Sequence, residues 1–111
     1  MFKIVENDIT LTRGDTAILD VVILDDFGEE YQLKSTDNLV LTVKEDVYSD
    51  KIILQKKADL KGMIEISHED TRLLSFQAYV YDVQLTQQSG DVSTIITPHK
   101  FVIATEVNDG Y

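Results

Sequence analysis

The amino-acid sequence predicts an all-β protein, because short runs of β-branched and aromatic residues recur about every ten residues with turn residues between them. No segment shows the period of a long amphipathic helix. This pattern is typical of an immunoglobulin-like antiparallel β-sandwich of about eight strands. A small β-barrel is the alternative, since a closed sheet is also built from short strands.

The predicted strands follow these runs along the chain. We expect them at residues 9–12, 16–24, 38–45, 51–57, 62–67, 78–87, 92–97 and 100–107, with a ninth edge strand at residues 2–5. Apolar residues occupy every second position in two of them, which is the period of a strand with one buried face. These two rows are Leu39, Leu41 and Val43, and Tyr79, Tyr81, Val83 and Leu85.

Residues 16–24 carry apolar side chains on both faces. Ile18, Val22 and Leu24 are interrupted only by Asp20, and the intervening positions are also apolar. Such a run is typical of a strand covered on both sides. We therefore expect this strand in the middle of a sheet.

Turn chemistry separates the runs. Gly14, Gly28 and Gly90 each lie in a turn that also contains aspartate, between two extended segments, and the turn at residues 89–91 predicts a hairpin. Pro98 is expected in a connection between the last two strands, where its missing N–H is harmless. Residues 67–74 have serine at a possible N-cap and two acids in the first turn, which predicts one short helical turn.

Length and charge restrict the class of protein. The 111 residues suit a single domain spanning 1–111 with one core. The net charge of -10 and the scattered basic residues argue against nucleic acid and against an anionic membrane surface. The N-terminus lacks the basic start and apolar run of a secretory signal, so we expect synthesis in the cytoplasm.

The sequence offers no catalytic constellation, and we expect no enzyme, no cofactor and no catalytic, cofactor-binding or metal-binding residues. The two histidines, His68 and His99, do not belong to a nucleophile motif, and we interpret both as surface residues. The five glycines are separate from one another, which excludes a phosphate-binding loop.

Two residue groups carry weaker alternatives. The acids that flank Gly28 at residues 25–30 suggest a calcium loop, but Phe27 interrupts the alternate spacing of acids that such a loop needs. We favour a turn kept soluble by its charges. Exposed tyrosines can bind carbohydrate, yet Tyr79 and Tyr81 share a strand face with Val83, which favours packing.

Several segments together resemble a known family. They are ITLTRGDTA at residues 9–17, VVILDDFG at residues 21–28, LTVK at residues 41–44 and the Tyr79-x-Tyr81 strand. This outline resembles the N-terminal domain of baseplate upper proteins and related small tail proteins of phages and prophages of Gram-positive bacteria. Known baseplate proteins continue into a long helical or receptor-proximal region, so we expect a separate adaptor or the head of a larger component.

The resemblance implies a non-enzymatic structural module of a phage tail or baseplate. Its partners would be other tail or baseplate proteins and further copies of itself, as a trimer or hexamer around the tail axis. Its location would be the virion, after synthesis in the host bacterial cytoplasm. The alternative from the residues themselves is a β-sandwich module that binds carbohydrate or another ligand.

Overall fold

The computed structural model describes residues 2–5 and 7–105, and the side chains of residues 7–105. This part of the chain is mostly β, which confirms the predicted all-β class. Its elements, in chain order, are β1 Phe2–Val5, β2 Asp8–Thr12, β3 Ala17–Asp20, β4 Asn38–Lys44, β5 Ile52–Lys57, β6 Met63–Ile66, α1 His68–Thr71, β7 Ala78–Thr86 and β8 Val92–Ala104. The end of the last expected strand, including Val107, and Tyr111 lie outside the described residues.

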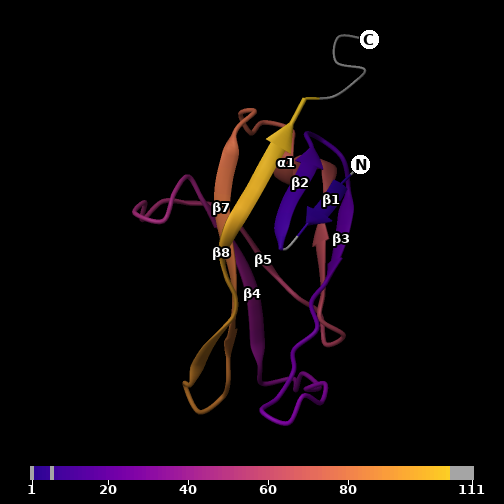
Figure 1. Cartoon of the computed structure of the whole chain (residues 1–111), viewed down its shortest axis with the longest axis vertical. Coiled ribbons are helices and arrows are strands. Elements are labelled where there is room, and N and C mark those ends of the chain that lie inside the picture. Colours follow the sequence, from indigo (N-terminus) through magenta and orange to yellow (C-terminus); the bar gives the residue numbers. More distant parts are fainter. Residues whose placement is uncertain (1, 6, 106–111) are drawn as a thin grey trace.

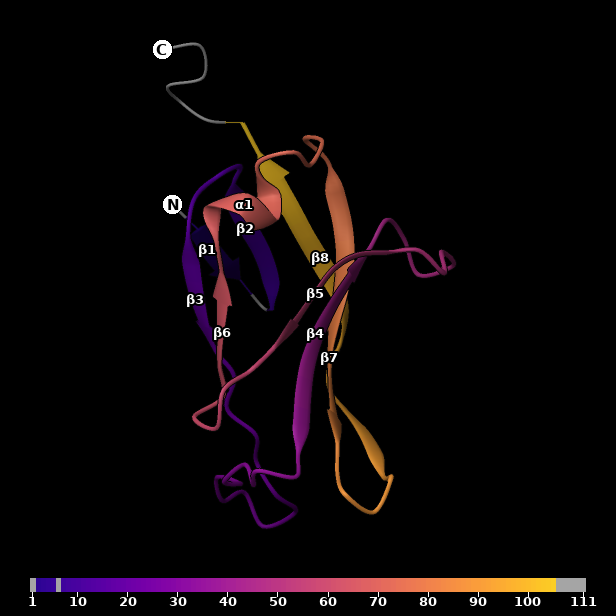
Figure 2. The ribbon, with the colours of Figure 1, turned by 180° about the vertical axis from the view of Figure 1, so that it is seen from behind.

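The strands form two sheets of unequal size (Figure 1). The larger sheet has the order β1-β2-β8-β7-β4-β5, with β1 at one edge as expected. The smaller sheet contains β3 and β6 alone, and Figure 2 shows them side by side beneath α1. The end strands β1 and β5 do not pair with each other, so the described strands form no closed barrel.

One pair of strands departs from the antiparallel arrangement. β2 runs parallel to β8, with Ile9 opposite Phe101 and Thr12 opposite Ala104, so the expectation of a purely antiparallel fold is wrong there. Parallel strands need a long connection. The whole of the chain between residues 12 and 92 supplies it, which local sequence patterns could not indicate.

The inward faces of the two sheets meet in one hydrophobic cluster. β4 and β7 alternate between buried and more exposed residues along their length, as the sequence predicted. Ala17, Leu19, Ile64 and Ile66 come from the small sheet, and their side chains are buried with those of the large sheet. Tyr81 and Phe101 meet edge to face, with ring centroids 6.1 Å apart.

The prediction for residues 16–24 is wrong in two respects. The strand β3 covers only Ala17–Asp20, and it lies in the two-stranded sheet rather than in the middle of the large one. The outward side chains of the predicted strand are solvent-exposed, at 60% for Ile18 within β3 and at 54% for Val22 and 62% for Leu24 beyond its end. Apolar residues on both faces predicted a covered strand, but the described residues cover only one of these faces.

The prediction of two final strands around Pro98 is also wrong. Residues 92–104 form the single strand β8, and Pro98 lies within it. The β7–β8 register shifts at this point, because Tyr81 pairs with His99 and Val83 with Ile96. Two residues of β8 therefore face Asp82 alone, and a bulge tolerates proline because the local ladder is already interrupted.

The predicted turns and the short helix are confirmed. Gly14, Gly28 and Gly90 have positive φ angles, and the turn at Gly90 joins the β7–β8 hairpin. In α1, the N–H of the N-cap residue Ser67 donates to the Asp70 carboxylate at 2.7 Å. Burial pushes the pKa of Asp70 upward, but hydrogen bonds from Lys56 and Ser67 outweigh it and lower the pKa overall.

Gly62 holds the small sheet against the chain that follows β3. Its φ angle is +82°, and a Cβ added there would lie 2.5 Å from the carbonyl oxygen of Val21. The N–H of Val21 donates to the Gly62 carbonyl at 2.9 Å, so neither backbone can withdraw without losing this bond. The position therefore requires glycine for its conformation and for its lack of a side chain.

We expect Gly62→Ala to lower the free energy of unfolding by about 2–4 kcal/mol, since the positive φ and the contact with Val21 both oppose a side chain. Gly90→Ala is the matched control, because Gly90 also has a positive φ, of +91°, but has open space where the Cβ would lie. Urea denaturation measures both. Equal losses for the two variants would contradict a specific role of the Val21 contact.

Candidate functional site

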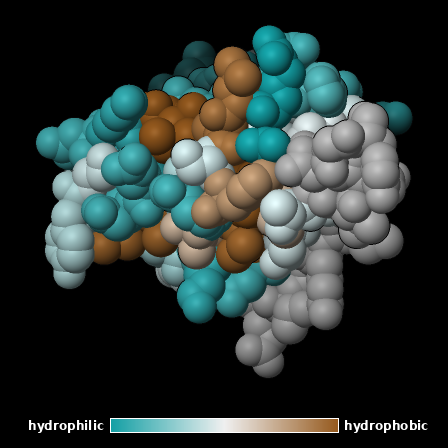
Figure 3. Space-filling view, turned by 90° about the horizontal axis from the view of Figure 1, so that it is seen from above, coloured by the Kyte–Doolittle hydropathy of each residue, from teal (hydrophilic) through white to brown (hydrophobic). Residues whose placement is uncertain are grey.

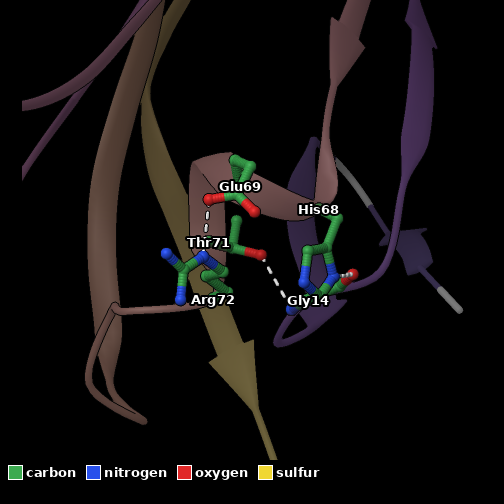
Figure 4. A network of polar contacts seen from close by, with 5 residues as sticks. All are labelled: Gly14, His68, Glu69, Thr71 and Arg72. Atoms are coloured by element: carbon green, nitrogen blue, oxygen red, sulfur yellow. Dashed lines mark hydrogen bonds and ion pairs between the residues drawn. The ribbon is translucent and has the colours of Figure 1, made fainter.

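The α1 helix closes on the turn between β2 and β3 through both backbone groups of Gly14 (Figure 4). The Gly14 N–H donates to Thr71 Oγ1 at 2.9 Å, and Thr71 is fully buried. His68 Nδ1 lies 2.6 Å from the Gly14 carbonyl oxygen, which requires that Nδ1 carries the proton and donates it. His68 is exposed, as predicted for a surface histidine, but its ring also holds this turn. The contact accounts for the residue in structural terms.

We expect Thr71→Val to lower the free energy of unfolding by about 1–3 kcal/mol, because the Gly14 N–H loses its acceptor in a buried place. Thr42→Val is the control, since Thr42 Oγ1 accepts its bond from Gln55 near solvent. Its loss should stay within about 0.5 kcal/mol. Chemical denaturation of the two variants and the wild type measures the difference. A T71V protein as stable as wild type would show that the bond from the Gly14 N–H to Thr71 does not stabilise the fold.

The acidic loop at residues 25–30, where a calcium site was the alternative, uses a carboxylate to bond its own backbone. Asp25 Oδ1 accepts the N–H groups of Phe27 at 2.9 Å and Glu29 at 3.0 Å, so this carboxylate organises its own loop. Among the described residues, no three or more histidine, aspartate or glutamate side chains gather in a way that could hold a metal ion. His99 contacts the carbonyl of Thr97 two residues away.

The tyrosines divide into buried and exposed residues. Tyr79 and Tyr81 are buried, which confirms the prediction that they pack in the core. Burial and the charge of Asp8 raise the pKa of Tyr81 to about 12, and its hydroxyl donates to the Asn7 carbonyl. Tyr48 is 92% exposed.

Asp37 joins Tyr31 to the start of β4. Its carboxylate accepts the Lys34 N–H at 2.9 Å and the Tyr31 hydroxyl at 2.7 Å. These bonds, the backbone one first, lower the pKa of Asp37. The network holds the long connection between β3 and β4 beside the β7–β8 hairpin, because Gln87 also donates to the Tyr31 hydroxyl.

Asp82 is the carboxylate with the opposite shift. It lies on the outer face of the large sheet, opposite Thr42, in a pocket of about 100 Å³ that also includes Lys44 and Pro98. Burial raises the pKa of Asp82, and the charge of Lys44 only partly opposes this. A raised pKa in the folded state means that the ionised carboxylate costs stability above that pKa.

We therefore expect Asp82→Asn to raise the free energy of unfolding at pH 7. The gain should shrink as the pH falls through the pKa of Asp82, because the wild-type carboxyl then becomes neutral as well. Asp26→Asn, in an exposed loop, controls for the loss of one negative charge. Urea denaturation at pH 7 and at about pH 3 tests this, and a gain that is larger at the acidic pH would contradict it.

Apolar surface is gathered at two other places. At the α1 end, Figure 3 shows hydrophobic surface lying among hydrophilic residues. Leu73, 80% exposed, and Phe76, 43% exposed, lie in the connection that follows α1. The guanidinium carbon of Arg13 lies 4.1 Å from the Phe76 ring centroid, so this ring already has a cation over it.

The second place is the outer surface of β3 and of the segment that follows it. We call Ile18, Val22 and Leu24 the outer row, since they lie at alternate positions and are each more than half exposed. The Val21 N–H points to Gly62, next to β6, so by alternation the backbone groups of Ile18 and Asp20 point away from β6. β3 pairs with β6 alone among the described residues, which leaves this edge open.

The apolar residues of the outer row are evident in the sequence, but their exposure to solvent is not. The apolar run was recognised, and the expectation was that neighbouring strands would cover it. Phe27 was noted only as an interruption of the acidic residues, yet its side chain is 90% exposed. The structure thus leaves the outer row and Phe27, all between residues 18 and 27, exposed to solvent.

Comparison with protein-family models, with curated proteins and with solved structures found no match. Across the described part of the chain, no helix has the length and apolar character needed to cross a bilayer.

Proposed function

We propose that this chain is a non-enzymatic assembly module of a phage or prophage tail or baseplate, which acts through protein–protein contacts as part of the virion. The observation that carries the proposal is the outer row, which leaves three large apolar side chains in water, Ile18 on the open strand β3 and Val22 and Leu24 on the segment that follows it. Monomeric proteins protect such edges, because an unpaired strand is a template for another chain. An exposed apolar strand is therefore best explained by a protein partner.

We further propose an immunoglobulin-like sandwich as the architecture. In that fold, strands C, F and G are neighbours in one sheet, and strands B and E lie in the other. The neighbours β4, β7 and β8 and the pair β3 and β6 occur in the matching chain order. Tyr79, near the start of β7, donates its hydroxyl to the Ser75 carbonyl at 3.3 Å, which resembles the tyrosine corner of immunoglobulin-like domains.

This architecture suggests why the edge of β3 is open. The sheet that holds strands B and E in an immunoglobulin-like domain normally has four strands. Here it has two among the described residues, while β2, which precedes β3 in the chain, pairs with β8, and β1 pairs with β2. A strand or surface from another subunit would complete the small sheet.

The family resemblance supports the assignment to a phage tail. One element of the outline is the turn at Gly14, which α1 holds through His68 and Thr71. A carbohydrate-binding module is the second candidate, and the exposure of Tyr48 favours it. With Tyr79 and Tyr81 buried, that candidate depends on a single described, highly exposed tyrosine.

Light scattering behind a sizing column tests the proposal, on the chain alone and mixed with structural proteins encoded beside it. We expect a complex of defined mass with at least one of them. We also expect the double variant Ile18→Ser, Val22→Ser to weaken it by at least about tenfold, since truncated interface anchors typically cost more than 1 kcal/mol each. Val47→Ser, at another exposed valine, should bind as wild type does.

Two results would count against this function. One is a chain that stays monomeric and forms no complex with any neighbouring structural protein. The other is a rise in melting temperature on adding oligosaccharides, lost in Tyr48→Ser, because a ligand stabilises the state that binds it.

A further inference from the structure

The loop at residues 25–30 presents an aromatic ring on a rigid support. We call it the Phe27 loop. Asp25 Oδ1 accepts two of its N–H groups, and the Asp25 N–H donates to the Glu29 carbonyl at 2.8 Å. Gly28 adopts a φ of +78° that allows this closed turn. The backbone is therefore held in place, and burying the Phe27 ring would cost little further chain entropy.

A groove runs along the outer side of β6 and the turn that precedes it. It has a volume of about 700 Å³, and Ile18 and Met63 contribute apolar surface to it. Lys56, Lys57 and Lys61 contribute positive charge. We call it the basic groove, although Asp59 and Glu65 also line it. Its mixture of apolar and cationic groups suits an apolar side chain with acids around it.

Two of these lysines are available to a partner. Lys56 Nζ lies 2.9 Å from Asp70, so its charge is already engaged. Lys57 and Lys61 are exposed and form no ion pair with any described residue. Asp59 is occupied, because its carboxylate accepts the N–H groups of Lys61 and Met63.

The distribution of charge makes these two surfaces complementary. The chain has a net charge of -10, so most orientations of two copies bring like charges together. Four of its ten basic residues lie between residues 51 and 61, and four of the six residues of the Phe27 loop are acidic. The loop against the groove is the pairing in which this charge attracts.

The Phe27 loop lies away from the groove of its own molecule. Ile18 in the groove belongs to β3, which ends at Asp20, and the chain continues beyond that end before it reaches Phe27. Figure 1 shows the chain after β3 continuing to the lower end of the molecule, away from β6 and α1. A Phe27 loop seated in the groove would therefore belong to another copy.

We infer that copies of this chain associate head to tail, with the Phe27 loop of one copy seated in the basic groove of the next. This inference rests on the proposed function and names one of its partners, a second copy. The contact uses two different surfaces of each molecule, so it is heterologous and can continue from copy to copy. Ile18 of the outer row would be covered by it.

Two variants each remove one half of the contact. Phe27→Ser removes the ring and leaves the groove unchanged. The double variant Lys57→Glu, Lys61→Glu reverses the charge of two groove residues and leaves the loop unchanged. All three residues are exposed, so the variants should fold, which circular dichroism verifies. Val47→Ser is the control at an exposed apolar residue outside both surfaces.

Sedimentation velocity of each protein, alone and mixed, then tests the inference. We expect concentration-dependent association of the wild type, weakened roughly tenfold when the salt rises from about 0.05 M to about 0.5 M. Each variant alone should remain monomeric. An equimolar mixture of the two should form a complex of twice the chain mass and stop there, because only one loop and one groove remain complementary.

Three results would overturn the inference: a monomeric wild type, variants that associate as wild type does, or a mixture that stays monomeric although the wild type associates. The last would indicate a symmetric contact elsewhere. A monomeric wild type that still forms a complex with neighbouring tail proteins would refute only this inference and leave the proposed function standing.

Discussion

The packing of the two-stranded sheet on the six-stranded one is the interaction on which the rest of the structure depends. Two strands alone are marginally stable in water, so β3 and β6 need an apolar surface to cover. The inward residues of β7, among them Tyr81 and Val83, belong to the buried cluster that includes Leu19 and Ile64. The apolar inner face of each sheet is therefore buried by the other sheet.

Short-range polar contacts hold the small sheet in this position. At one end α1 binds both backbone groups of Gly14, and Lys56 of β5 pairs with Asp70 of the same helix. At the other end the Val21 N–H bonds to Gly62, where a side chain would not fit. Because these contacts lie at opposite ends of β3 and β6, they fix the small sheet's orientation while its inner face supplies the buried area.

The inequality of the sheets has a consequence for function. Among the described residues, six strands bury one face against two. The small sheet is left with an open edge, and the outer row is exposed at Ile18 in β3 and at Val22 and Leu24 after it. In the assembly module that we propose, this surface is where a partner would bind. Four carboxylates, by contrast, stabilise the chain's own turns. Backbone N–H groups donate to Asp25, Asp37, Asp59 and Asp70.

The sequence by itself determined the all-β class, most strand positions, the hairpin at Gly90 and the helical turn after Ser67, because period and turn chemistry are local properties. It also indicated the burial of Tyr79 and Tyr81 from their shared row. Only the tertiary structure decided that β2 runs parallel to β8, that Pro98 lies within a strand and that the outer row faces solvent. Those features depend on which distant segments become neighbours. The sequence pattern of an apolar residue is the same whether its own chain or a partner covers it.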